Sequence, residues 1–162
     1  MNQYRMPAVW SPTTRDHDPR HEVWVGVATT GTEVAARVDA ILTAVTEGGH
    51  RLVEATPQSD DVLAQVHDPS LLTFLATAAE RWRQGPYADL VGQTRVVPYL
   101  FPTPAMTAGL PTRRAVSIHA EAGSYAYDTM TLVGPGTWEA ARAAVDCALG
   151  AAYLVLAGGR AA

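Results

Sequence analysis

The chain has 162 residues, of which 48% are hydrophobic, and this is enough for one domain with a core. Its net charge of −4 gives no electrostatic reason to expect a nucleic acid or an anionic membrane as partner. The sequence lacks both a signal-peptide pattern and an apolar run of the roughly 20 residues that span a bilayer. Because it also has a single cysteine, Cys147, it predicts a cytoplasmic protein.

The pattern of the first 26 residues predicts a strand followed by a polar loop. The strand is expected at residues 7–10 and the loop at residues 11–26, with charged and imidazole side chains crowded between Thr14 and Glu22. Such a loop is either simply solvated or lines a polar pocket. His17 and His21 are four positions apart, but Pro19 between them opposes a helix that would present both to a metal.

A helix is expected next, with Thr32 as its N-cap and Glu33 in its first turn. Gly48 and Gly49 would end it, and a short strand is predicted at residues 51–54, followed by a short helix from Asp60 to about residue 67. The apolar stripe of the first of these helices is predicted at Val34, Val38, Ile41, Leu42 and Val45.

Asp68 and Pro69 suit the N-cap and first positions of a further helix. Its core-facing side chains are predicted to be Leu71, Leu72, Leu75, Ala78, Ala79 and Trp82. Regular patterning is then lost over residues 84–118, which are rich in proline yet carry the apolar run of residues 99–101. A segment of this kind either packs against its own domain or forms an interface with another chain.

The last predicted element is a long helix that begins after Gly134-Pro135-Gly136, with Thr137 as its N-cap, and ends at Gly158-Gly159. A buried helix with a small-residue exit usually leads to a strand in an α/β protein. The chain is therefore expected to be the front part of a larger domain, or a relic of one. The apolar stripe of this helix is predicted at Ala141, Ala144, Val145, Ala148, Leu149, Ala152 and Leu156.

The common catalytic motifs are absent from the sequence. It has no dinucleotide-binding or phosphate-binding glycine loop, no nucleophile elbow and no CxxC pair. Ser117, His119 and Glu121 follow one another on one short stretch, so they are not expected to converge as a catalytic triad. These motifs therefore identify no catalytic group and no metal ligand in the chain.

Three groups of residues together resemble a known family. They are His17–Glu22; His67-Asp68-Pro69 with Leu72, Phe74-Leu75 and Glu80-Arg81-Trp82; and Gly134-Pro135-Gly136-Thr137-Trp138-Glu139-Ala140-Ala141. From Trp10 onward the chain resembles the N-terminal portion of acetylpolyamine amidohydrolases, which belong to the histone deacetylase superfamily. The resemblance implies an incomplete arginase/deacetylase-type three-layer α/β fold over residues 1–162, with a parallel sheet and flanking helices.

The resemblance also implies zinc-dependent hydrolysis of acetylated polyamines or acetyl-lysine. The metal ligands and catalytic histidines of the family are expected beyond Ala162, so no residue of this chain is given either role. The chain is then expected to be truncated before the metal site, to hold no zinc and to be inactive alone. The alternative is a non-catalytic binding or assembly protein that uses the early loop and the apolar segment of residues 84–118.

Some substrate-binding residues can be carried over by position. Glu22 and Trp24 correspond to the rim of the family's pocket, where a carboxylate and an aromatic ring suit a cationic amine. His119 and Met130 stand where the polyamine enzymes can have glutamates, with Glu121 and Asp128 as nearby carboxylates.

The resemblance therefore names Glu22, Trp24, His119, Glu121 and Asp128 as candidate substrate-binding residues, although Asp128 equally suits a loop cap. The proline-rich segment at residues 84–118 resembles the family's long dimerisation loop. It therefore predicts a homo-oligomer.

Overall fold

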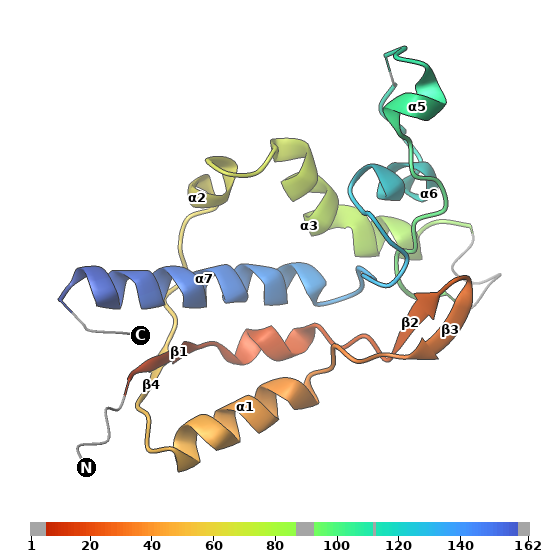
Figure 1. Cartoon of the computed structure of the whole chain (residues 1–162). Coiled ribbons are helices and arrows are strands. Elements are labelled where there is room, and N and C mark those ends of the chain that lie inside the picture. Colours follow the sequence, from red (N-terminus) through yellow and green to blue (C-terminus); the bar gives the residue numbers. More distant parts are fainter. Residues whose placement is uncertain (1–5, 87–92, 112, 159–162) are drawn as a thin grey trace. The chain divides into compact units, whose positions relative to one another are not determined.

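The computed structural model describes residues 6–86, 93–111 and 113–158, shown in Figure 1. These residues form two compact units. The first unit contains residues 6–18, 33–62 and 136–158, and the second contains residues 19–32, 63–86, 93–111 and 113–135.

The first unit is built on two short parallel strands, β1 (Ala8–Trp10) and β4 (Leu52–Glu54). Ala8 lies opposite Leu52 in the ladder, and both strands occur where the sequence predicts them. The other elements of this unit are the 3-10 helix η1 (Pro12–Asp16), α1 (Ala36–Glu47) and α7 (Thr137–Leu156). The helix α2 (Asp61–Ala64) lies where the chain passes from the first unit to the second.

Both threonine caps predicted from the sequence are wrong. The helix α1 begins later than expected, at Ala36. The N–H of Ala35, just before it, donates to Oδ1 of Asp18 at 3.1 Å. The N-cap of α7 is Gly136, with φ of +79°, while the hydroxyl of Thr137 lies 2.9 Å from Nδ1 of His17. Each threonine hydroxyl has a polar partner elsewhere in the chain, which the local sequence pattern does not show.

The predicted apolar stripe of α7 is also not its most buried face. The buried residues are Ala140, Ala143 and Asp146, whereas Ala141 and Leu156 are exposed. Alanines occur on every side of this helix, so hydrophobicity alone does not fix its orientation. Burial of the Asp146 carboxylate is tolerated because it accepts hydrogen bonds from the N–H of Gln58 and from Arg142.

The second unit packs around α3 (Pro69–Arg83), which begins as predicted, with Asp68 as N-cap and Pro69 in the first turn. Its buried face is Phe74, Ala78 and Trp82, at the four-residue spacing of one helix face. The sequence prediction included Ala78 and Trp82 but omitted Phe74. The core of the unit consists of Phe74, Ala78, Trp82, Val96, Ile118 and Ala122.

The remaining elements of the second unit are short. An antiparallel hairpin is formed by β2 (His21–Trp24) and β3 (Val27–Thr30). The region at residues 11–26, predicted as a loop, therefore contains η1 of the first unit and the first strand of this hairpin. An isolated antiparallel bridge joins Val96 to Val133. The helical turns are α5 (Pro104–Thr107), α6 (Ile118–Glu121) and the 3-10 turn η2 (Ala122–Ser124).

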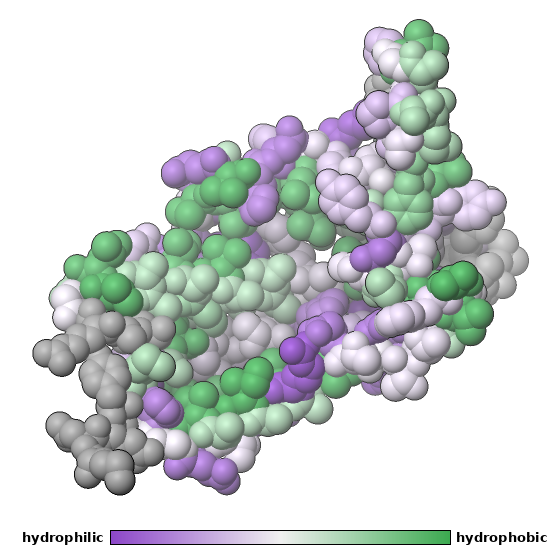
Figure 2. All heavy atoms as spheres, viewed as in Figure 1, coloured by the Kyte–Doolittle hydropathy of each residue, from purple (hydrophilic) through white to green (hydrophobic). Residues whose placement is uncertain are grey.

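The segment at residues 84–118 is partly buried and partly exposed, and its residues 87–92 and 112 lie outside the described residues. Gly159, which the sequence analysis placed at the end of the last helix, also lies outside them. Val96 and Pro98 are buried, whereas Tyr99 and Leu100 are 82% and 51% exposed. Hydrophobic residues are visible in Figure 2 over the part of the chain that carries α5. In the described ranges, no helix is both long enough and apolar enough to cross a bilayer.

Candidate functional site

The first part of the candidate site is the β2–β3 hairpin of the second unit. Its turn residues, Val25 and Gly26, both have positive φ angles, of 48° and 82°, as two-residue hairpin turns of type I′ require. Glu22 and Trp24 are two positions apart on β2, so their side chains leave the same face of the strand. Glu22 is 6% exposed, while Trp24 is 52% exposed.

The carboxylate of Glu22 is held by three hydrogen bonds. The indole Nε1 of Trp24 donates to Oε2 at 2.8 Å, and the N–H and hydroxyl of Thr32 donate to Oε1 at 2.8 and 2.7 Å. These bonds fix the positions of the acid and the aromatic ring before any ligand arrives. A carboxylate joined to an exposed indole is an arrangement that favours a cationic group.

The second part is the turn at Asp128, which hydrogen bonding joins to the hairpin. Oδ1 of Asp128 accepts from the N–H groups of Thr131 and Met130, both at 2.8 Å, and these bonds lower the pKa of its carboxyl group. Asp128 is therefore ionised at neutral pH, and it caps its own loop. The hydroxyl of Thr129 donates to the carbonyl of Val23 at 2.7 Å, which ties this turn to β2.

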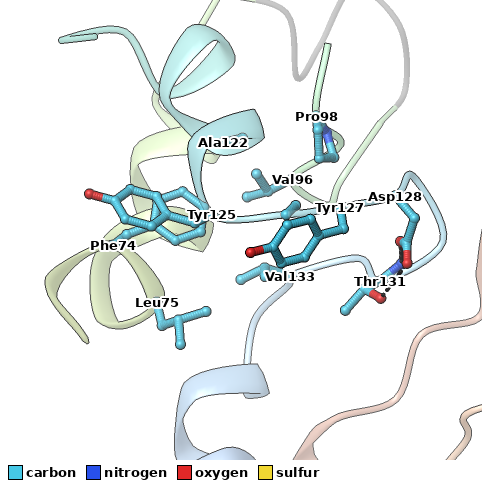
Figure 3. Close-up of a pocket in the computed structure, with 11 residues that line it drawn as sticks. Phe74, Leu75, Val96, Pro98, Ala122, Tyr125, Tyr127, Asp128, Thr131 and Val133 are labelled. Atoms are coloured by element: carbon cyan, nitrogen blue, oxygen red, sulfur yellow. Dashed lines mark hydrogen bonds between the residues drawn. The ribbon is translucent and has the colours of Figure 1, made fainter. Parts of the chain in front are cut away.

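A pocket of about 180 Å³ lies beside the Asp128 turn. Figure 3 shows the Phe74 and Tyr125 rings on one side of it, Asp128 and Thr131 on the other, and the ring of Tyr127 between them. The Phe74 and Tyr125 rings stack with their centroids 4.7 Å apart. The sequence analysis did not find this pocket, although the aromatic residues at positions 125 and 127 next to Asp128 were a signal for it.

The third candidate region, α6, carries Glu121 and His119. Glu121 is 2% exposed and forms ion pairs with Arg81 at 2.5 Å and with Arg114 at 3.1 Å. Two guanidinium groups therefore surround one carboxylate, and the cluster of these three side chains carries a net positive charge. Each carboxylate oxygen of Glu121 is therefore paired with an arginine.

His119 packs against the core of the second unit. Its ring lies 4.6 Å from the ring of Trp82, and its Nδ1 is 3.3 Å from the hydroxyl of Ser117. Burial lowers the pKa of His119, because the protonated ring is less well solvated there. At neutral pH this side chain is therefore uncharged.

The described residues do not fit a zinc site. Across residues 6–86, 93–111 and 113–158, no three His, Cys, Asp or Glu side chains gather where they could hold a metal ion. Nδ1 of His17 is 2.9 Å from the hydroxyl of Thr137, and Nε2 of His21 is 3.2 Å from Oε1 of Gln93. These two histidines therefore have polar contacts within their own units.

Comparison with known proteins identifies the relatives of this chain. No family model matches it. It is 30% identical over 158 residues to the acetylpolyamine amidohydrolase of Mycoplana ramosa, and 30% identical over 161 residues to acetylpolyamine amidohydrolase 1 of Pseudomonas aeruginosa. Each alignment covers 97% of this chain and 44% of the relative, so the chain spans less than half the length of these proteins.

The crystal structure of acetylpolyamine aminohydrolase from Burkholderia pseudomallei superposes with a TM-score of 0.81 at 25% identity. The match covers 96% of this chain and 42% of that chain. The fold is therefore α/β, with part of the deacetylase architecture, as the sequence analysis predicted. The chain is thus similar to the N-terminal portion of the acetylpolyamine amidohydrolases.

Proposed function

We propose that this chain supplies the substrate-entrance part of an amidohydrolase that releases acetate from an acetylated amine. The names of its relatives support this reaction class. The observation that carries the proposal is the joined pair of Glu22 and Trp24, which the bond from Thr129 to Val23 ties to the Asp128 turn.

The proposed roles of these residues are binding and orientation. The carboxylates of Glu22 and Asp128 attract the ammonium end of the substrate, and the exposed indole of Trp24 offers it a ring face. A cation over an aromatic ring contributes about 0.5–2 kcal/mol, depending on its exposure to water. We assign Glu121 and His119 a supporting role, because Glu121 is paired with two arginines and His119 packs on Trp82.

A binding experiment tests this proposal directly. N-acetylputrescine is titrated into the 162-residue chain by calorimetry at low and at high salt. We expect weak saturable binding that salt weakens, because the attraction is between charges. Glu22→Gln and Asp128→Asn should each weaken it about 3-fold or more, because each removes one charge that attracts the ammonium.

The control is Glu47→Gln, which removes an exposed carboxylate from α1, outside the site. It should bind like the unaltered chain. The proposal is wrong if the two site variants also bind like the unaltered chain, or if N-acetylputrescine does not bind at all.

We further propose that this chain alone neither binds zinc tightly nor hydrolyses an acetylated amine. The support is the arrangement of the described His, Cys, Asp and Glu side chains, which provides no group of three for a metal. Titration with Zn²⁺ should therefore show only weak binding. A tight one-to-one complex, or steady acetate release by the isolated chain, would overturn this part of the proposal.

A second candidate function, assembly into a homo-oligomer, is favoured by the exposed apolar side chains of residues 99–110. Tyr99, Leu100, Met106 and Leu110 are between 51% and 82% exposed. Such side chains are poorly placed in water unless a second copy covers them. Light scattering should then show a concentration-dependent increase in mass that Leu100→Asp or Phe101→Asp abolishes.

Val66→Asp is the matched control for these variants, because Val66 is 79% exposed but lies outside the segment. It should leave the mass unchanged. Equal masses for all three variants and the unaltered chain would count against assembly through this segment.

A further inference from the structure

The floor of the pocket beside the Asp128 turn is apolar and well packed. Val96, Phe74 and Ala122 line it and are each at most 2% exposed. Val133 lies next to them, held by the backbone bridge to Val96. A ligand group that enters this pocket leaves water for hydrocarbon, which favours an apolar group and disfavours a second ammonium.

The walls of the pocket are aromatic. The Tyr125 ring is fixed by its stack on Phe74. The ring of Tyr127 is fully exposed and lies between the Phe74–Tyr125 stack and Asp128 in Figure 3. An apolar cavity of about 150 Å³ can hold a benzene molecule. The volume here, about 180 Å³, therefore suits a ring or a branched chain of about six heavy atoms.

The charges around the pocket favour a single positive charge on the ligand. Asp128 is the only charged residue among the described residues that line it. Its hydrogen bonds to the N–H groups of Thr131 and Met130 keep it ionised. The residue before Ala122 is Glu121, whose pairing with Arg81 and Arg114 makes that cluster cationic and unfavourable for a polycation.

We propose that the Tyr125–Tyr127–Asp128 pocket binds the hydrophobic group of an amine that carries one ammonium, so that the site prefers apolar monoamines to polyamines. This inference rests on the proposed function, because it also takes the ligand to be an amine. The class of amine differs, since the names of the relatives refer to acetylpolyamines and this pocket is proposed to prefer an apolar monoamine.

The test uses the 162-residue chain and three probes: 2-phenylethylamine, its uncharged analogue 2-phenylethanol, and spermidine. Dissociation constants are measured by NMR titration at 150 mM salt. We expect 2-phenylethylamine to bind about 10-fold more tightly than spermidine and about 3-fold more tightly than 2-phenylethanol. Its resonance shifts should be confined to residues that line the pocket, such as Tyr125, Ala126 and Val133.

Two variants locate the binding. Ala126→Leu narrows the pocket and should weaken 2-phenylethylamine at least 5-fold. Asp128→Asn should weaken it about 3-fold without disturbing the loop, because the amide oxygen still accepts the N–H bonds of Met130 and Thr131. Glu47→Gln is the charge control and should have no effect. The shift map is read on the unaltered chain, so it decides the matter even where a variant misfolds.

The outcomes separate this inference from the proposed function. Spermidine binding as tightly as 2-phenylethylamine, or shifts located outside the pocket, overturns the inference alone. Binding of N-acetylputrescine without binding of 2-phenylethylamine does the same. Binding of 2-phenylethylamine in the pocket, with no binding of N-acetylputrescine, supports the inference and overturns the proposed function.

Discussion

Replacing Glu22 by glutamine should destabilise the hairpin of the second unit. The carboxylate accepts from Nε1 of Trp24 and from two donors of Thr32, all at 2.7–2.8 Å. A glutamine side chain has one oxygen, so its amide nitrogen must face at least one of these donors. The variant therefore loses at least one charge-assisted hydrogen bond, and each such bond contributes about 1.5–3 kcal/mol.

We expect Glu22→Gln to lower the free energy of unfolding by about 2 kcal/mol. The assay is urea denaturation followed by tryptophan fluorescence, with Glu47→Gln as the control. Trp24→Phe removes the indole donor but leaves the Glu22 carboxylate and its two bonds from Thr32 in place, and it should cost about 1 kcal/mol. A Glu22→Gln variant that unfolds within about 0.5 kcal/mol of the unaltered chain would refute the reasoning, since ordinary surface changes have effects of that size.

Three further predictions follow from single positions. Val25 has a φ of +48° and is fully exposed, so its side chain strains the turn without packing against anything. Val25→Gly should therefore raise the free energy of unfolding, measured in urea, by about 0.5–1 kcal/mol after the entropic cost of glycine is subtracted. An unchanged free energy of unfolding would show that the turn is unstrained. Burial lowers the pKa of His119 below its usual 6.5, so the unfolded chain takes up this proton first and stability falls as the pH drops below about 6.5. His119→Phe should reduce the difference in unfolding free energy between pH 7.5 and pH 5.5, and an unchanged difference would contradict this. A Cβ at Gly123 would collide with the carbonyl oxygen of Leu100, so Gly123→Ala should lower the free energy of unfolding by at least about 2 kcal/mol. A variant of unchanged stability, with unchanged hydrogen exchange in η2, would be evidence against that contact.

Local signals in the sequence predicted the fold where the neighbouring residues decide it. Asp68 and Pro69 start α3 as expected, because the side chain of Asp68 binds an N–H only two residues away. Thr32 and Thr137 suit N-caps equally well by residue type. Their hydroxyls bind Glu22 and His17 instead, and those partners lie 10 and 120 positions away, beyond the reach of a local capping pattern.

The same distinction holds for the candidate site. The spacing of Glu22 and Trp24 places both on one face of β2, and the structure joins them directly. The pocket next to Asp128 could not be predicted in this way, because Phe74, Val96 and Tyr125 come from distant parts of the chain. Nor does any local pattern pair Glu121 with Arg81, forty positions earlier.

The indole N–H of Trp24 gives the most direct test of the amine-binding claim, because it donates to the carboxylate proposed to attract the ammonium. Its NMR resonance is followed while N-acetylputrescine is added, with the uncharged N-butylacetamide as comparison. The account predicts a saturable shift of this resonance with the amine and a much smaller one with the uncharged amide. An indole resonance that stays fixed at saturating amine, or moves equally with both compounds, would contradict it.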